Sequence, residues 1–360
     1  MSLPQIARKD SARLEAAEAF LLESLRPKAQ QMDQDLAALT QGLDGLGGRG
    51  WLGLRVPEEF GGLGFDDRAF RRFQETCSRC SGALAFLQTQ HQSACGFLAK
   101  SENEDLKERT LPKLATAERT AGIAFSQLRR TGNPLLTAEP SHSGYLLSGK
   151  APWITGWGIF DACVTAATLP SGDTIFVWHR LEESRGFKVS EPMRLASIEV
   201  AQTVSGEFVD FAVPEEDILY IRPGNWIHEN DLINIALQSP FSLGCARAGI
   251  DVMRDAFAKK PIDAIALTAD SLEKELECCR DEAYGAMENK GDTERSLNAR
   301  AWAIHLAGRC AHAAVAASSG AGNSMQHAAQ RVYREALVFT VSAQTTPIME
   351  ATLRRLASPQ

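Results

Sequence analysis

The 360-residue sequence has no run of 18 uncharged apolar residues, so it lacks a segment that could span a bilayer as a helix. Its first twenty residues, MSLPQIARKDSARLEAAEAF, carry charges throughout and lack the apolar core of a secretory signal. These two absences predict a cytoplasmic protein. The formal net charge of −7 at pH 7 gives no electrostatic reason to expect a nucleic-acid surface.

A metal-binding pattern is also missing. The eight cysteines are scattered, and Cys77 and Cys80 have no second cysteine or histidine pair at the spacing of a zinc site. Their segment has helical periodicity, so we interpret them as helix residues, with a metal or redox role as the alternative. Cys278 and Cys279 point to different faces of a helix and cannot share one ligand sphere locally. His91 lies in an apolar-leaning helical segment, so we interpret it as a core residue.

Hydrophobic periodicity divides the chain into three parts. Residues 5 to 118 follow a helical pattern, interrupted by the segment GLGGRGWLGLRVPEEFGGLGF (45–65), which is expected to be a loop. Short alternating or β-branched segments fill residues 120 to 222 and predict an antiparallel β unit. Helical periodicity returns at Trp226 and continues to about Ala357. We therefore predict an α+β protein with an N-terminal helical domain (1–119), a central β-barrel-like domain (120–224) and a C-terminal helical bundle domain (225–360).

The segment KAPWITGWGIFDACV (150–164) contains a Trp-Ile-Thr triplet within the predicted β unit. In a strand, Trp153 and Thr155 share one face, and Ile154 points to the other. An indole and a hydroxyl on one face suit a flat heteroaromatic ligand, because the indole packs on its face and the hydroxyl bonds to its edge. The alternative is that Trp153 is a core aromatic residue and Thr155 an edge-strand residue with a water partner.

Five segments occur in the same order as five landmarks of the acyl-CoA dehydrogenase family. The resemblance covers nearly the whole chain. It implies an N-terminal helical domain, a central β domain and a C-terminal helical bundle, with FAD as cofactor and oxidation of the CH–CH bond of an acyl thioester as activity. The five segments are GWLGLRVPEEFGGLG (50–64), LPKLATAERTAGIAFSQ (111–127), GYLLSGKAPWITGWGIFDACV (144–164), VDFAVPEEDIL (209–219) and RVYREALVFTVSAQTTPIMEATLRRL (331–356).

The resemblance implies which residues contact FAD. Trp153 and Thr155 match the family's residues at the isoalloxazine ring, and Ser126 matches a hydroxyl residue on the pyrimidine side of the flavin. Gly320 and Gly322 in SSGAGN (318–323) resemble a glycine-rich turn where backbone close to the dinucleotide leaves no room for a Cβ. The alternative for these glycines is a helix C-cap.

Two further segments carry candidate cofactor residues. Gln344 and Thr345 lie where the family's chain passes the flavin, with two solvated loop residues as the alternative. The family's turn that supplies donors to the pyrophosphate reads QLRRTGN (127–133) here, and its serine is replaced by Gly132. Thr131, together with Arg129 and Arg130, could compensate for the lost donor.

The family's catalytic base is missing from this sequence. Members of the family use a glutamate to remove the α-proton of the thioester, and the alignment on Thr345 puts Ala343 at that position. The second position that some members use falls on Gln238 and Ser239, neither of which is acidic. Glu350 is the nearest carboxylate in sequence and a weak candidate. The catalytic residue is therefore unknown from sequence.

Assembly and partners follow from the same comparison. The family's Arg-x-x-Phe-Gly segment, which reaches the FAD of a neighbouring subunit, is replaced by PIDAIALTAD (261–270). Alanine-rich helical faces such as AHAAVAASSGAG (311–322) predict a homodimer or homotetramer. The resemblance implies an acyl-CoA or related small-molecule substrate and an electron-acceptor flavoprotein as candidate partner, with no nucleic acid and no membrane span.

Two other functions remain open at this stage. A flavin-dependent monooxygenase on the same scaffold would need no glutamate base. A degenerate relative that binds flavin or CoA without catalysis would be compatible with the loss of the glutamate, serine and arginine features.

Overall fold

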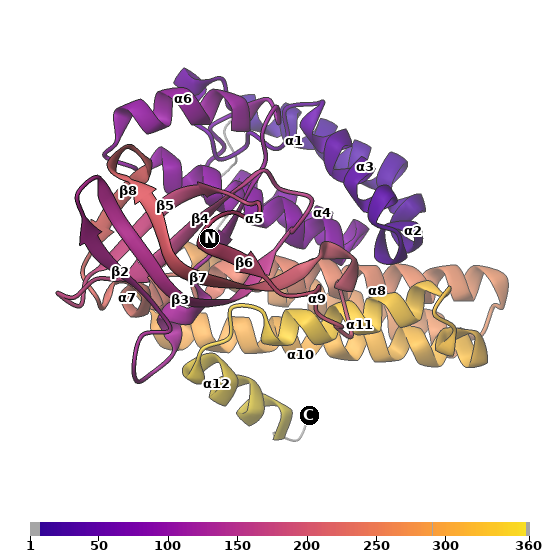
Figure 1. Ribbon diagram of the computed structural model, residues 1–360. Helices are drawn as coiled ribbons and strands as arrows, with labels where there is room; N and C mark the ends of the chain where they lie inside the picture. The colour runs from indigo at the N-terminus through magenta and orange to yellow at the C-terminus, as the bar shows by residue number, and fades with distance from the viewer. Residues whose placement is uncertain (1–7, 290, 358–360) are drawn as a thin grey trace.

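The computed structural model describes residues 8–289 and 291–357. Along this part of the chain, helices α1 to α6 are followed by strands β1 to β8 and then by helices α7 to α12 (Figure 1). The element type changes between Ala115 and Ala121 and again between Arg222 and Trp226. The exact division into domains stays a prediction, and its outermost residues, 1–7 and 358–360, lie outside the described part.

Side-chain caps begin the helices that matter most for the site. Asp66 accepts a hydrogen bond from Ala69 N at the start of α4, and Ser81 accepts one from Leu84 N at the start of α5. These bonds satisfy amide groups that a helix start leaves without a partner. Ser81 has an extended backbone, which separates α4 from α5. The N-terminal helices are α1 (Arg8–Phe20), α2 (Ala29–Gln34), α3 (Leu36–Gly47), α4 (Asp67–Cys80), α5 (Gly82–Ala99) and α6 (Glu104–Ala115).

The predicted loop at residues 45–65 is shorter in the structure, because α3 continues to Gly47. Leu43 and Leu46 on this helix are buried, and their burial offsets the poor helix propensity of the glycines. From Gly48 to Asp66 the chain has only one short 3₁₀ turn, Glu58–Phe60, which ends at Gly61 in the left-handed region (φ +81°). That conformation favours glycine.

The central strands form one mixed sheet, which corrects the prediction of an antiparallel β unit. β1 pairs with β4 in parallel, because the chain leaves β1, forms the β2–β3 hairpin and returns as β4 running in the same direction. The order is β6-β7-β3-β2-β4-β5-β8, with β1 beside β4. The strands are β1 (Ala121–Ala124), β2 (Leu136–Ser141), β3 (Gly144–Thr155), β4 (Ala162–Thr168), β5 (Thr174–Arg180), β6 (Phe187–Val189), β7 (Thr203–Pro214) and β8 (Ile218–Arg222).

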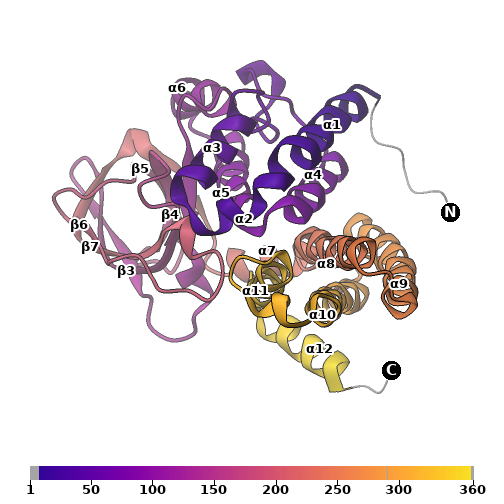
Figure 2. The same ribbon diagram turned by 90° about the vertical axis from the view of Figure 1, so that its right-hand side faces the viewer.

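The sheet curls round on itself, as its end-on view in Figure 2 shows, and aromatic side chains fill its interior. Phe187 and Phe208 lie with ring centroids 4.6 Å apart, and Phe211 and His179 pack edge-on against them. His179 is buried and shares a hydrogen bond with the Thr165 hydroxyl. The predicted barrel-like shape is therefore explained by inward-facing aromatic side chains on β5, β6 and β7.

The remaining helices pack beside the N-terminal helices and the sheet (Figures 1 and 2). α8 contacts α4, α9, α10 and α11, and α12 lies against α10. α12 ends at Ala357, where the sequence pattern ended. These helices are α7 (Trp226–Ile233), α8 (Ser239–Lys259), α9 (Asp263–Glu288), α10 (Thr293–Ser318), α11 (Ala328–Val341) and α12 (Thr346–Ala357).

A buried ion pair joins α11 to the start of α5. Arg331 donates to Glu335 Oε1 at 2.8 Å, and the same oxygen accepts a hydrogen bond from Gly82 N. A Cβ at position 82 would lie 2.7 Å from Glu335 Cγ, so glycine allows this close approach. The α5 start is thus fixed to the C-terminal helices by a charge-assisted hydrogen bond.

His91 is fully buried, which confirms its interpretation as a core residue, and it joins α5 to the sheet. Its Nδ1 accepts from Ala121 N at 3.2 Å, and its Nε2 lies 3.3 Å from the Leu114 carbonyl oxygen. An imidazole protonated only at Nε2 satisfies both contacts. Burial lowers the pKa of His91 to about 4, and burial likewise lowers the pKa of His179 to about 4.

Stability should therefore fall as the pH is lowered from about 6.5 to about 4. In that window the unfolded chain binds a proton at each of these histidines and the folded chain does not, which costs up to about 3 kcal/mol per histidine. Urea unfolding of parent and His91→Gln across this range should give a smaller pH dependence in the variant. His312 is exposed, so His312→Gln serves as the control and should keep the parent slope. If the free energy of unfolding of the His91 variant depends on pH as steeply as that of the parent, His91 does not have a lowered pKa in the folded protein.

Candidate functional site

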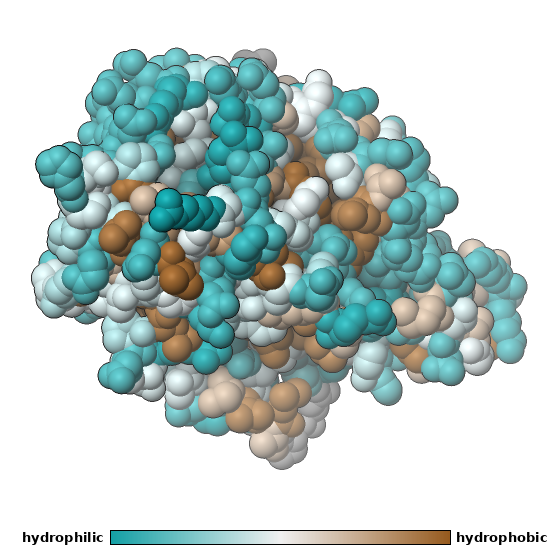
Figure 3. Space-filling model, viewed as in Figure 1, coloured by the Kyte–Doolittle hydropathy of each residue, from teal (hydrophilic) through white to brown (hydrophobic). Residues whose placement is uncertain are grey.

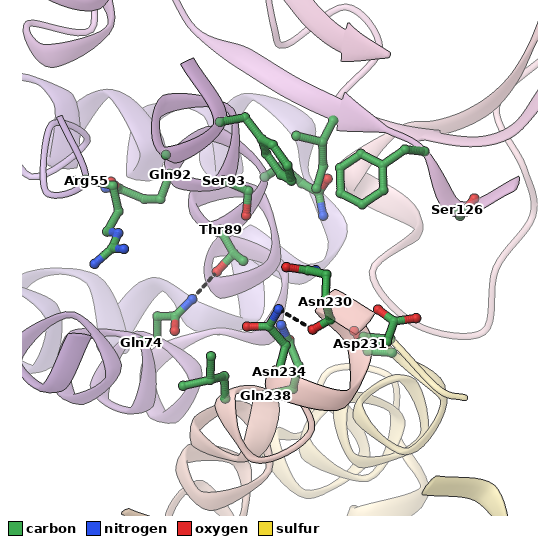
Figure 4. A pocket seen from close by; sticks show the side chains of 18 of the residues that line it. Arg55, Gln74, Thr89, Gln92, Ser93, Ser126, Asn230, Asp231, Asn234 and Gln238 are labelled. Atoms are coloured by element: carbon green, nitrogen blue, oxygen red, sulfur yellow. Dashed lines mark hydrogen bonds between the residues drawn. The ribbon is translucent and has the colours of Figure 1, made fainter. Parts of the chain in front are cut away.

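A cavity of about 490 Å³ lies where the three groups of elements meet. One wall comes from α4 and α5, a second from β1, β3 and the turn after β1, and a third from α7, the start of α8 and residues 342–348. In Figure 4, Gln74 and Thr89 lie on one side of this space and Ser126 on the opposite side. A ligand in this cavity would therefore touch all three parts of the chain.

The sheet contributes the Trp-Ile-Thr triplet. Trp153 and Thr155 both line the cavity, whereas Ile154 is fully buried on the other side of the strand. The prediction that the first two share a face is confirmed. Trp153 is 47% exposed, so the alternative that it is a core aromatic residue is wrong. Thr155 Oγ1 lies 3.0 Å from Thr203 Oγ1, a bond that leaves the Thr155 hydroxyl one further hydrogen-bonding direction.

Ser126 follows β1 and also lines the cavity. Its Oγ is buried and has no hydrogen-bond partner within the described chain. A buried hydroxyl without a partner is costly, on the order of 1–3 kcal/mol. This orphaned atom, together with the indole of Trp153 and the hydroxyl of Thr155, fits the edge and face of a flat polar ring.

The third wall includes the turn between α11 and α12. Ser342, Ala343 and Thr345 line the cavity, and Ala343 has a left-handed backbone (φ +50°). Arg300 on α10 holds this turn by donating to the carbonyl oxygens of Phe339 and Ser342 at 3.3 and 3.2 Å. Burial lowers the pKa of Arg300 to about 10. Arg300 thus places a buried cation at the C-terminus of α11, where helix carbonyls favour positive charge.

The carboxylates at the cavity are both paired. Asp67 and Asp231 are the acidic residues in its lining among the described residues. Asp67 accepts from Arg55 at 3.0 Å, and Asp231 accepts two bonds from Arg129 at 2.7 and 2.8 Å. Gln238 lines the cavity as a neutral amide. The cavity therefore offers no carboxylate without a cationic partner.

Glu350 is not a member of the site. It lies on α12, is exposed and pairs with Arg354 at 3.9 Å. Ala343 lies in the turn before α12, which begins at Thr346, so Glu350 is on a different element from Ala343. The structure therefore does not bring Glu350 to the cavity lining.

Four predicted cofactor residues lie outside the cavity lining. Thr131 is exposed, in the segment between β1 and β2, and Gln344 donates to the Thr340 carbonyl oxygen at 3.3 Å. Gly320 faces open space in the 3₁₀ turn Ser319–Asn323. At Gly322 a Cβ would meet this chain's own Val315 carbonyl oxygen at 3.1 Å, so the glycine serves local packing. By contrast, the other four predicted residues all line the cavity: Ser126, Trp153, Thr155 and Thr345.

Sequence reasoning missed the polar network on α4 and α5. Arg71 donates to Gln74 at 2.7 Å, and Gln74 donates to Thr89 at 2.9 Å, a bond drawn in Figure 4. In the sequence Arg71 stands between Phe70 and Phe73 in a charge-rich helix, where most cations face solvent, so no local signal marked it. Only the packing of α4 against the cavity reveals its place.

No group of histidine, cysteine, aspartate and glutamate in the described residues is arranged to hold a metal ion. Cys77 and Cys80 are buried in α4 as free thiols, which fits their interpretation as helix residues. Cys278 is exposed and Cys279 buried, on different faces of α9. Of the described helices, none is long and apolar enough to cross a membrane.

Comparison with known proteins finds similarity to the acyl-CoA dehydrogenases. The model of the acyl-CoA dehydrogenase N-terminal domain matches residues 9–118, which span the N-terminal helices that form one cavity wall. Over these residues the chain is similar to the acyl-CoA dehydrogenase family. It is 27% identical over 262 residues to the mitochondrial isovaleryl-CoA dehydrogenase of Pongo abelii, a match that covers 70% of this chain and 58% of that relative.

Solved structures of this family share the whole architecture. A complex of glutaryl-coenzyme A dehydrogenase with glutaryl-CoA aligns over 99% of this chain and 97% of its own, with a TM-score of 0.83 and 21% identity. An acyl-CoA dehydrogenase from Bacillus anthracis complexed with FAD aligns over 98% of this chain and 68% of its own, with a TM-score of 0.81 and 19% identity. The likeness confirms the predicted arrangement of helical, β and helical parts.

Proposed function

We propose that this protein is an FAD-dependent oxidoreductase of the acyl-CoA dehydrogenase type, acting on the CH–CH bond of an acyl thioester or a related substrate. The observation that carries the proposal is the cavity that unites Ser126, Trp153 and Thr155 with the turn at Ala343. The similarity to acyl-CoA dehydrogenases supports the same cofactor and reaction class.

The cavity residues fit FAD. Trp153 would pack on the isoalloxazine ring, and the hydroxyls of Ser126 and Thr155 would bond to its polar edge. Thr345 would contribute a further hydroxyl from the α11–α12 turn. When bound, FAD supplies the acceptor for a hydride from the β-carbon of the substrate.

The chain's own groups provide binding and orientation but no evident base. Ala343 cannot accept a proton, and the two lining carboxylates are held by Arg55 and Arg129. The contacts with arginine occupy both carboxylates, so neither is positioned as a free base in the cavity. Removal of an α-proton should therefore be slow with ordinary acyl-CoA substrates.

The missing base favours one alternative function, a flavin-dependent monooxygenase on the same scaffold. Such a reaction needs oxygen and reduced flavin but no carboxylate at Ala343. A non-catalytic flavin- or CoA-binding relative is the other alternative, and the paired state of Asp67 and Asp231 fits it equally. A substrate screen under anaerobic and aerobic conditions separates the three functions.

The first test concerns Trp153. Because its side chain is half exposed, Trp153→Ala should cost less than about 1 kcal/mol of stability, yet weaken FAD retention by ~10-fold through lost ring packing. The measurements are flavin absorbance after gel filtration and thermal unfolding of the flavin-free protein. Trp302, which donates to Glu275 and does not line the cavity, gives the control variant Trp302→Ala. The Trp302→Ala variant should lose stability and keep its FAD affinity. If Trp153→Ala instead loses stability and keeps its FAD affinity, the assignment of Trp153 to the flavin is refuted.

The second test restores the missing carboxylate. Ala343→Glu should raise the rate of anaerobic flavin reduction by an acyl-CoA by about 10²–10⁴-fold, the usual worth of a positioned general base. The backbone at φ +50° is no worse for glutamate than for alanine, since both carry a Cβ. Arg334 will not trap the new carboxylate, because it is already bound to Asp33.

Ala343→Gln is the matched control and should stay as slow as the parent. A fast parent would show that another residue supplies the base, and Asp231→Asn would then be the next variant. If the parent and Ala343→Glu both hold FAD and neither shows flavin reduction by an acyl-CoA, the dehydrogenase proposal fails. The monooxygenase function would then be tested with NADH-supplied reduced flavin and oxygen.

We further propose that a second copy of the chain covers an apolar face of α11 and α12. Exposed apolar side chains recur every three or four residues on both helices, and Figure 3 shows apolar atoms where α12 lies. This spacing gives one continuous stripe on each helix. The side chains are Tyr333, Leu337 and Val341 on α11 and Met349, Leu353 and Leu356 on α12. A cytoplasmic location and an electron-acceptor flavoprotein as partner remain predictions.

Sedimentation velocity tests this assembly. The parent should sediment at twice the 39.2 kDa chain mass or more. The double variant Leu337→Asp, Leu353→Asp should associate ~10-fold or more weakly, because an apolar contact would bury two carboxylates. Leu267 is an isolated exposed leucine on α9, so Leu267→Asp is the control and should associate like the parent. A parent that stays monomeric at micromolar concentration would contradict the proposal.

A further inference from the structure

A cationic end of the cavity is formed by α4, α5 and the loop before α4. Arg71 lines this end, and its Nε is buried without a hydrogen-bond partner. Arg71 forms no salt bridge with a carboxylate in the described chain, in contrast to Arg55, Arg129 and Arg222, which line the same cavity and are each paired with one. Arg71 is thus the cavity arginine without a carboxylate partner.

The neighbours of Arg71 hold it but do not neutralise it. Gln74 Oε1 accepts from Arg71, and Gln74 Nε2 donates to Thr89 Oγ1. Thr89 Oγ1 also accepts from Gln88 at 2.8 Å. With two bonds accepted, the Thr89 hydroxyl has its own hydrogen left to donate, and Thr89 lines the cavity. This end of the cavity therefore presents donors: the Arg71 guanidinium and the Thr89 hydroxyl.

A second positive charge lies close by. The guanidinium carbons of Arg55 and Arg71 lie 5.2 and 5.1 Å from the centroid of the Phe70 ring. Burial, and after it the charge of Arg55, lower the pKa of Arg71 to about 10. Asp67 offsets part of this repulsion but is already bonded to Arg55. A desolvated cation beside a like charge is stabilised by an anion that can reach it.

The α4–α5 end of the cavity lies apart from the residues proposed to hold the flavin ring. The residues suited to the ring come from the sheet and from the α11–α12 turn, and Figure 4 shows Ser126 across the cavity from Gln74, to which Arg71 is bonded. A plain hydrocarbon tail would leave the donors of Arg71 and Thr89 without acceptors, at the cost of burying them unsatisfied. The donor set instead matches the two oxygens of a carboxylate.

We propose that this protein binds an acyl thioester whose acyl chain ends in a carboxylate, and that Arg71 together with Thr89 receives that carboxylate at the α4–α5 end of the cavity. The inference rests on the proposed thioester-binding function and adds the substrate class to it. Gln74 acts as a positioning residue, because its amide fixes the guanidinium of Arg71.

Equilibrium binding to the FAD-loaded full-length protein tests the inference. Isothermal titration calorimetry would compare glutaryl-CoA with pentanoyl-CoA, and adipyl-CoA with hexanoyl-CoA, so that each pair differs only in the terminal group. Free CoA is the fifth probe. A charge-assisted contact predicts that the carboxylate-ended member of a pair binds about 10- to 100-fold more tightly.

Variants on α4 assign the effect to one residue. Arg71→Met should abolish the preference within each pair while leaving pentanoyl-CoA and free CoA affinities and FAD retention unchanged. Arg71→Lys should keep part of the preference, because it retains the charge without the planar fork. Arg68 lies on the same helix, outside the cavity lining, and pairs with Glu288, so Arg68→Met is the control and should behave as the parent.

The outcomes separate the two proposals. Equal binding of both members of each pair by the parent, or a preference that survives in Arg71→Met, overturns the carboxylate inference and leaves the thioester function standing. A loss of free CoA affinity in Arg71→Met as large as the loss for glutaryl-CoA also overturns it, since Arg71 would then contact CoA. Failure of every thioester and of CoA to bind refutes both. If Arg71→Met does not fold, the parent's preference and its reduction in Arg71→Lys decide the question.

Discussion

The polar residues buried on α5 are the constraint on which the rest of the structure depends. This helix packs against the other N-terminal helices, against β1 and against the C-terminal helices, so its polar groups must find protein partners. His91 binds the sheet through Ala121 N, Gln92 bonds to the loop at Trp51 and Arg55, and Gly82 N bonds to Glu335. Each bond fixes α5 to a different part of the chain, and the face left over forms a wall of the cavity.

The packing of α5 therefore decides which side chains line the cavity, and these differ between its two sides. Its sheet side presents an exposed indole and an orphaned hydroxyl, which suit a flat ring. Its α4–α5 side presents Arg71 and Thr89, which suit an anion. The α11–α12 turn adds only the methyl group of Ala343, and both lining aspartates are paired with arginines. The site is well equipped for binding and poorly equipped for proton removal.

Three arginines around this site, Arg300 and Arg331 buried and Arg71 half-buried, have partners of different kinds. Arg300 binds helix-terminal carbonyl groups, and Arg331 binds a carboxylate. Arg71 has only an amide from the protein. A half-buried cation that has no carboxylate partner is stabilised by an anion that can reach it, so the third arrangement is the one that suits an anionic ligand. The comparison explains why Arg71, and not Arg300, indicates substrate chemistry.

The sequence by itself determined the order of helical and β parts and the placement of Trp153 and Thr155 on one face, because hydrophobic periods of 3.6 and 2 are local properties. The resemblance also predicts that Ala343 stands where related enzymes carry a catalytic glutamate. Tertiary structure decided the rest. Contacts between residues distant in sequence decide the parallel β1–β4 pairing and the position of Arg71 in the cavity lining. They also decide that Glu350, Gly320 and Gly322 lie outside that lining. No local pattern encodes such contacts, since they arise only when separate elements pack.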